Sequence, residues 1–189
     1  MRHLQAARGT PLTDSGDAGD AGEGTSSSPP AAAPNRLPLV LAVAAVVVVV
    51  DVVSKVIAVD HLSGRPPVHV IDDFLELTLT RNAGAAFSVG VGATVVFSVL
   101  AVVVAAVIIR TATRLRHVGW GIALGLLLGG ALGNLVDRLV RSPGPLRGEV
   151  IDWIRLPHWP VFNIADASIV CGAILAALVV LLGHQLDER

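Results

Sequence analysis

Four long apolar segments dominate the chain from residue 37 onward. They cover about 37–59, 90–109, 118–139 and 163–183. An α-helix rises about 1.5 Å per residue, so about 20 residues cross the roughly 30 Å of hydrocarbon in a bilayer. Helices are expected because lipid offers no partners for backbone N–H and C=O groups. The pattern therefore predicts an all-α membrane protein with four transmembrane helices.

A different pattern lies between the first two apolar segments. The residues LELTLT at 75–80 alternate apolar and polar side chains, and this period of two predicts a short half-buried strand. We therefore expect a small extracytoplasmic β element within residues 60–89, between helices 1 and 2. Residues 141–162 contain four prolines and are expected to form an irregular loop.

The first 36 residues differ in composition from the rest of the chain. Gly, Ala, Ser, Pro and Asp dominate them, and they contain too few large apolar side chains to offset the entropy lost on ordering. No apolar core of a secretory signal peptide precedes Leu37. The sequence predicts two regions, a disordered tail at 1–36 and a four-helix membrane domain at 37–189.

Composition agrees with a membrane protein and excludes several other classes. Charged residues make up 15% of the chain, against about 25% in soluble domains, and the mean hydropathy is +0.70. A net charge of -1, with the basic residues scattered, argues against a nucleic-acid partner. The single cysteine cannot form a disulfide framework. No HExxH motif, closely spaced histidine pair or phosphate loop is present, so we expect neither a metal nor a cofactor.

Polar residues within the membrane domain gather at one end of the predicted helices. With four spans, the end of the first, the start of the second, the end of the third and the start of the fourth face the same side. The polar residues there are Asp51, Lys55, Asn82, Asn134, Asp137, Arg138, Asp152, Asn163 and Asp166. Ionisable groups at this depth cost several kcal/mol unless paired, so they are candidates for function.

Several of these residues also have a structural interpretation. Asp51 and Lys55 are spaced i, i+4 and could neutralise each other on one helix face. Asn134 and Asp137 share a face, where they either pack the helix end or take part in chemistry. The adjacent Arg138 is either a counter-ion or an interface anchor.

Two asparagines have similar alternatives. Asn82 either caps a turn or holds a substrate backbone. Asn163 and Asp166 are spaced i, i+3 at the start of the fourth span, where a carboxylate favours the positive end of the helix dipole. Capping of this helix and a role in a site are both open.

Asp152 is the hardest of these residues to explain by structure alone. It lies between Ile151 and Trp153, so its carboxyl is expected to be partly desolvated, with its pKa raised. A protonated and an ionised carboxyl held close together can activate water and protonate a scissile amide. Asp166 begins the following helix and could approach Asp152. A Ser–Lys dyad is less well supported, because Ser54 does not face Lys55, the only lysine, on a helix, and Ser88 or Ser98 could reach it only through tertiary contacts.

Five sequence blocks together carry a family resemblance. They are DVVSK at 51–55, RNAGAAFS at 81–88, GGALGNLVDR at 129–138, VIDW at 150–153 and FNIAD at 162–166. Over about residues 37–183 the chain resembles bacterial lipoprotein signal peptidases, the signal peptidase II family of membrane aspartyl proteases.

The resemblance implies an activity and a set of site residues. Asp152 and Asp166 correspond to the catalytic pair. The substrate-binding or supporting positions are Asp51, Lys55, Asn82, Gly84, Asn134, Asp137, Arg138 and Asn163. The implied substrates are diacylglyceryl-modified prolipoproteins, cut before the lipidated cysteine without a cofactor.

The implied location is the bacterial cytoplasmic (inner) membrane, where the chain contacts membrane lipid. We expect a multi-pass monomer with its active site near the extracytoplasmic face and both termini in the cytoplasm. Arg110, Arg114 and Arg116 between spans two and three favour this orientation, although the loop at 141–162 carries three arginines as well.

Two other classes of function are compatible with a small polar membrane protein. An ion- or proton-coupled carrier could use Asp51, Asp137 and Asp166, with Lys55, as a relay. Such a relay would spread polar groups through the membrane depth, whereas here most of them lie at one face. A non-catalytic adaptor would use the polar blocks for helix packing and would leave Asp152 unexplained.

Overall fold

The computed structural model describes residues 35–84 and 90–183, without the side chains of 90–93. The predicted tail at 1–36 lies almost wholly outside the described residues, as do positions 85–88 of the RNAGAAFS block.

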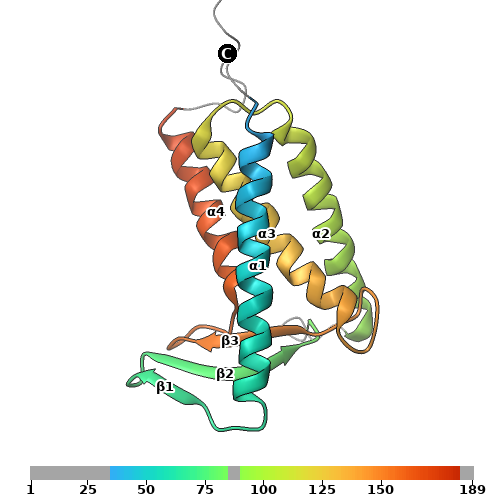
Figure 1. Ribbon diagram of the computed structural model, residues 1–189, viewed down its shortest axis with the longest axis vertical. Helices are drawn as coiled ribbons and strands as arrows, with labels where there is room; N and C mark the ends of the chain where they lie inside the picture. The colour runs from blue at the N-terminus through green and yellow to red at the C-terminus, as the bar shows by residue number, and fades with distance from the viewer. Residues whose placement is uncertain (1–34, 85–89, 184–189) are drawn as a thin grey trace, which may run out of the picture. The chain divides into compact units, whose positions relative to one another are not determined.

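Four long helices form the membrane domain (Figure 1). They are α1 (Leu37–Leu62), α2 (Gly90–Ala112), α3 (Val118–Val140) and α4 (Ile164–Leu181). Each contains a stretch long and apolar enough to cross a bilayer, which confirms the four predicted spans. In α3, 56% of the span is buried inside the protein, against 22%, 22% and 17% in α1, α2 and α4. The third helix is therefore the central one, and the others expose most of their apolar surface to lipid.

Glycines on α3 let α1 approach it closely. A Cβ added at Gly125 or Gly129 would lie 2.6 Å from the Cβ of Val43 or Val47. One turn further on, a Cβ at Gly133 would lie 2.7 Å from the Asp51 carboxylate. Small residues at this spacing permit close helix packing in membranes. Here they also bring a charged residue of α1 against α3.

A three-stranded antiparallel sheet lies at the end of the bundle where α1 finishes (Figure 1). It contains β1 (Val68–Ile71), β2 (Leu75–Asn82) and β3 (Val150–Arg155), in that order. The first two strands confirm the β element predicted between α1 and α2. The third strand corrects the prediction of an irregular loop at 141–162, and Asp152 lies in this strand rather than on a loop.

The prediction of an irregular loop in place of β3 was wrong for a physical reason. Its prolines lie before and after the strand, and VIDWIR is rich in β-branched and aromatic residues. The strand pairs with β2, about 70 residues earlier in the chain. Asn82 lies opposite Val150 and Thr80 opposite Asp152, so the side chains of Asn82 and Asp152 are diagonal neighbours on one face.

Candidate active site

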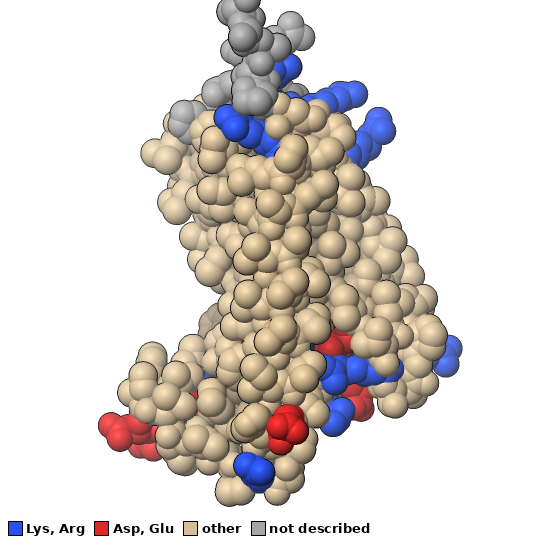
Figure 2. Space-filling model, in the orientation of Figure 1, with Lys and Arg blue, Asp and Glu red and all other residues tan. Residues whose placement is uncertain are grey.

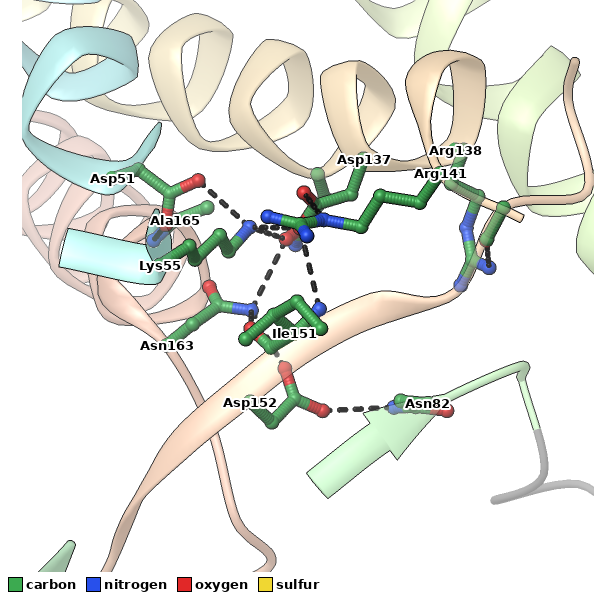
Figure 3. A network of polar contacts seen from close by, with 12 residues as sticks. Asp51, Lys55, Asn82, Asp137, Arg138, Arg141, Ile151, Asp152, Asn163 and Ala165 are labelled. Carbon is green, nitrogen blue, oxygen red and sulfur yellow. Dashed lines mark hydrogen bonds and ion pairs between the residues drawn. The ribbon is translucent and has the colours of Figure 1, made fainter. Parts of the chain in front are cut away.

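Lys55 occupies the centre of a buried cluster of charges between α1 and α3 (Figure 3). Its Nζ lies 2.7 Å from Asp51 Oδ2 and 2.9 Å from Asp137 Oδ2, and it donates to Asn134 Oδ1 at 3.0 Å. The side chain is fully buried, and these three acceptors match its three N–H donors. The predicted pairing of Asp51 with Lys55 is confirmed, and the same ammonium also links α1 to α3.

The two carboxylates around Lys55 each hold the backbone of another element. Asp51 Oδ1 accepts a hydrogen bond from Ala165 N, in the first turn of α4, at 2.8 Å. Asp137 Oδ2 accepts from Ile151 N in β3 at 3.2 Å. Ala165 and Ile151 directly precede Asp166 and Asp152 in the chain. The cluster therefore fixes the two backbone segments that carry the candidate catalytic residues.

Two arginines complete this cluster in different ways. Arg141 pairs with Asp137 through Nε, whereas Arg138 donates to Gly148 O at 3.1 Å. Of the two roles considered for Arg138, the counter-ion role is supported, because the charges of Asp152, Asp137 and Asp166 all act on its guanidinium, and its hydrogen bond also holds the loop before β3. Arg141 was not among the predicted site residues, although its i, i+4 spacing from Asp137 is a usable signal.

The start of α4 is held by a reciprocal cap. Asn163 Oδ1 accepts from Asp166 N at 2.9 Å, and Asp166 Oδ2 accepts from Asn163 N at 3.2 Å. The Asn163 amide nitrogen also donates to Asp152 Oδ1 at 2.7 Å and contacts Asn134 Oδ1 at 3.2 Å. The capping interpretation is therefore confirmed, and the same side chain also connects the cap to Asp152.

Asp152 is a buried carboxyl held by two amide donors. It is 2% exposed, and it accepts from Asn163 at Oδ1 and from Asn82 Nδ2 at Oδ2, the latter at 3.1 Å (Figure 3). Burial, and next the negative charge of Asp166, raise the pKa of Asp152 to about 6, although both amide hydrogen bonds and Lys55 act in the opposite direction. A carboxyl in this state exchanges a proton close to neutral pH.

Asp166 is half-buried and has a different environment. Its Oδ1 accepts from Asn134 Nδ2 at 2.7 Å, and its Oδ2 from the backbone of Asn163. Asn134 thus presents its oxygen to Lys55 and its nitrogen to Asp166. The amide orientation is fixed by the charged cluster on one side and supports the carboxylate on the other.

Both aspartates open onto one cavity of about 390 Å³. Asn82, Asn134 and Arg138 supply the other polar part of its lining. The remaining walls are mostly apolar and come largely from α2 and α3, with Phe97, Leu100, Ala101, Val104, Leu127, Ala131, Leu135, Val150 and Ile169, beside the hydroxyl residue Ser98. The two carboxyls therefore lie at the polar part of a largely apolar cavity.

Gly84 supports the orientation of Asn82. Its N–H donates to Asn82 Oδ1 at 2.8 Å, and its φ of +90° is one that residues with a Cβ rarely adopt. Asn82 therefore both caps a turn, through its oxygen, and contacts Asp152, through its nitrogen.

The Ser–Lys alternative has no support in the described residues. Ser54 donates to Asp51 O, and the partners of Lys55 are two carboxylates and an amide. Ser98 donates to Leu146 O and Thr94 O, and Ser88 lies outside the described residues. Within residues 35–84 and 90–183, no group of three His, Cys, Asp or Glu side chains could hold a metal ion.

The fold and the site together define a multi-pass membrane protein with paired carboxyl groups at one end of its helices. Residues 43–182 match the family model described as signal peptidase (SPase) II. The chain belongs to the signal peptidase II family, as the five sequence blocks suggested.

Relatives and solved structures agree with this assignment. The lipoprotein signal peptidase of Mycobacterium tuberculosis is 46% identical over 177 residues, which cover 94% of this chain and 86% of the relative. That of Mycolicibacterium smegmatis is 51% identical over 158 residues, covering 84% and 67%. A solved bacterial membrane enzyme is 31% identical with a TM-score of 0.68, covering 76% of this chain and 93% of that one. The chain is thus a multi-pass bacterial membrane protein of a peptidase family, which disfavours the carrier and adaptor interpretations.

Proposed function

We propose that this chain is an aspartic endopeptidase that removes signal peptides from diacylglyceryl-modified prolipoproteins, with Asp152 and Asp166 as catalytic residues. Family membership supports the substrate class. The observation that carries the catalytic assignment is the placement of two carboxyls, in unlike environments, on one cavity at the end of the bundle. Pairs of carboxyls with different proton affinities divide acid and base roles between them.

In the proposed active state Asp152 carries a proton, which is its main form below a pH of about 6, and Asp166 is the general base. Burial raises the pKa of Asp152, whereas Asp166 has an amide donor, a backbone donor and the positive end of α4 beside it. The charges of the cluster agree with this state. The carboxylates of Asp51, Asp137 and Asp166 are matched by the cations of Lys55, Arg138 and Arg141, so a neutral Asp152 leaves the site without net charge.

The reaction then needs no covalent intermediate with the protein. Asp166 takes a proton from a water molecule, whose oxygen attacks the scissile carbonyl carbon, while Asp152 donates its proton to the carbonyl oxygen. The resulting tetrahedral diol collapses as Asp166 passes its proton to the leaving nitrogen and Asp152 recovers one from a hydroxyl. The C–N bond breaks, giving a carboxylic acid and an amine, and both aspartates return to their starting states.

The supporting residues keep this arrangement rigid. Asp51 and Asp137 hold the backbones of α4 and β3, and Asn134 and Asn163 hold the two carboxyls. Preorganised groups of this kind need no rearrangement when charge moves during the reaction. The apolar walls of the cavity suit the apolar segment of a membrane-embedded signal peptide, and a lipid-anchored precursor places its scissile bond at the depth of the aspartates.

Charge distribution supports an extracytoplasmic position for this site. Arg36, Arg110, Arg114 and Arg116 lie at the helix ends remote from the sheet, where Figure 2 shows basic side chains gathered. Within the described residues, that end contains no Asp or Glu. Positively charged loops stay in the cytoplasm, so we place the sheet and the site outside and both termini inside. A single chain supplies every group of the site, in keeping with a monomer.

Cleavage of a purified precursor tests the proposed function. Wild-type protein in lipid nanodiscs should cut a diacylglyceryl-modified prolipoprotein directly before the modified cysteine, as identified by mass spectrometry, and should leave the unmodified precursor intact. Asp152→Asn and Asp166→Asn should each lower kcat by about 10²-fold to 10⁴-fold. Asp60→Asn is the matched control, because its side chain is 79% exposed on α1. Normal cleavage by either site variant would refute the catalytic assignment.

A further inference from the structure

Two hydroxyl side chains on α2 are buried although this helix is otherwise mostly apolar. Thr94 is 2% exposed and Ser98 is 1% exposed, one turn apart. Ser98 Oγ donates to Thr94 O at 2.9 Å within its own helix, and to Leu146 O at 2.8 Å. Thr94 Oγ1 instead donates to Ala83 O, outside the helix, at 2.6 Å. A hydroxyl in a helix commonly bonds to the preceding turn of that helix, so the partner of Thr94 calls for another explanation.

The partner of Thr94 belongs to the turn that orients Asn82. Ala83 is exposed, and it joins Asn82 to Gly84, whose N–H donates to Asn82 Oδ1. With its oxygen held there, the Asn82 amide turns its nitrogen toward Asp152 Oδ2. Thr94 also lies against the glycine, because a Cβ added at Gly84 would be 3.6 Å from Thr94 Oγ1.

We propose that Thr94 is a positioning residue, which fixes the Ala83–Gly84 turn and thereby holds the Asn82 amide in the orientation that donates to Asp152. This inference rests on the proposed function, since it assigns Thr94 a part in setting the protonation of a catalytic carboxyl. The hydroxyl acts through the turn and Asn82 and does not touch the reacting atoms.

Loss of the Thr94 hydroxyl has a definite consequence for Asp152. The Asn82 hydrogen bond favours the charged carboxylate, so a loosened Asn82 raises the pKa of Asp152 above its value of about 6. The other groups that act on Asp152 come from separate elements and stay in place. They are Lys55 from α1, Arg138 from α3, and Asn163 and Asp166 at the start of α4.

A pH profile of kcat/KM, compared between the wild type and variants of Thr94 and its neighbours, tests the inference. In the wild type, activity falls as pH rises through the pKa of Asp152, because the proposed mechanism needs this carboxyl protonated. Thr94→Val, which keeps the shape but removes the hydroxyl, should move this upper limb to higher pH by roughly half a unit. The activity at pH 7 relative to the plateau should then be about three times that of the wild type. Thr94→Ser keeps the hydroxyl donor, so its kcat/KM should fall over the same pH range as that of the wild type.

Ser98→Ala is the matched control on the same helix face. It removes a buried hydroxyl whose bonds go to Leu146 and Thr94 carbonyls, so it should lower thermal stability without moving the limb. Thr94→Ala substitutes for Thr94→Val if that variant does not fold. In an Asn82→Ala background, the limb should already be displaced, and Thr94→Val should add no further shift.

The possible failures are distinguishable. A wild-type profile without an upper limb, or an active Asp152→Asn variant, contradicts the proposed function itself. An upper limb that Thr94→Val and Thr94→Ala leave in place contradicts only the role of Thr94. An equal shift in Ser98→Ala also contradicts it, because the effect would then reflect general loosening of α2.

Discussion

Replacing Asp152 by asparagine should change the pH dependence of stability in a predictable direction. The pKa of Asp152 is about 6 in the folded protein, against 3.8 for an ordinary aspartate. Because the folded-state pKa lies above the unfolded value, the folded protein binds more protons than the unfolded one between about pH 4 and pH 6. Wild-type stability therefore falls as pH rises through this window. An asparagine side chain cannot ionise, so the Asp152→Asn variant lacks this loss.

The size of the effect follows from the shift in pKa. A change of about two units corresponds to about 3 kcal/mol of unfolding free energy, at 1.36 kcal/mol per unit. The substitution also places an amide nitrogen opposite Asn82 or Asn163, both of which donate to Asp152, at a cost of about 1–3 kcal/mol. This cost does not depend on pH. The stability of the variant relative to the wild type should therefore rise by about 3 kcal/mol between pH 4 and pH 7.5.

Thermal unfolding of both proteins in the same detergent, from pH 4 to pH 7.5, measures this difference. The variant should gain roughly 6–12 °C in Tm relative to the wild type across the range. Groups that titrate alike in both proteins cancel in the comparison. A relative Tm that stays constant, or that falls with rising pH, would refute a buried Asp152 with a raised pKa and with it the proton assignment.

Three further predictions concern the charged cluster, the packing of α1 on α3 and the orientation of the chain in the membrane. Asp137→Asn should lower the unfolding free energy by about 3–5 kcal/mol, because it breaks a buried ion pair with Lys55, and a Tm equal to the wild type would contradict this role. Gly133→Ala should reduce both Tm and cleavage, since the added Cβ would lie 2.7 Å from the Asp51 carboxylate. Gly64→Ala is the control: its φ is positive, but no atom lies near the added Cβ, so cleavage should be unchanged. Cysteine at position 147 should react with a membrane-impermeant thiol reagent from outside intact cells and cysteine at position 114 should not, and the reverse pattern would invert the proposed orientation.

The helices could be predicted because the signal is local. Each span is a mostly apolar segment of the length that a bilayer requires, and the polar residues near its end mark a common side of the membrane. The capping of α4 by Asn163 and the pairing of Asp51 with Lys55 could also be anticipated, because residues three or four apart meet on a helix.

The features that the sequence does not predict depend on contacts between segments far apart in the chain. β3 could not be recognised from the prolines around it, because its partner strand ends at Asn82, far earlier in the chain. The pairing of Arg141 with Asp137 could be predicted from their i, i+4 spacing, as for Asp51 and Lys55. Thr94 gives no local signal at all, since its partner is the backbone carbonyl of Ala83, a group that every residue has.

Infrared difference spectroscopy with isotope-labelled aspartate tests the central claim most directly, because it reports whether Asp152 is protonated. We expect one protonated-carboxyl band in the wild type that disappears as pH rises through about 6. The band should be absent in Asp152→Asn, unchanged in Asp60→Asn, and displaced to lower pH in Asp166→Asn, where the negative neighbour is gone. A band that persists in Asp152→Asn and is lost in Asp166→Asn would contradict the assignment.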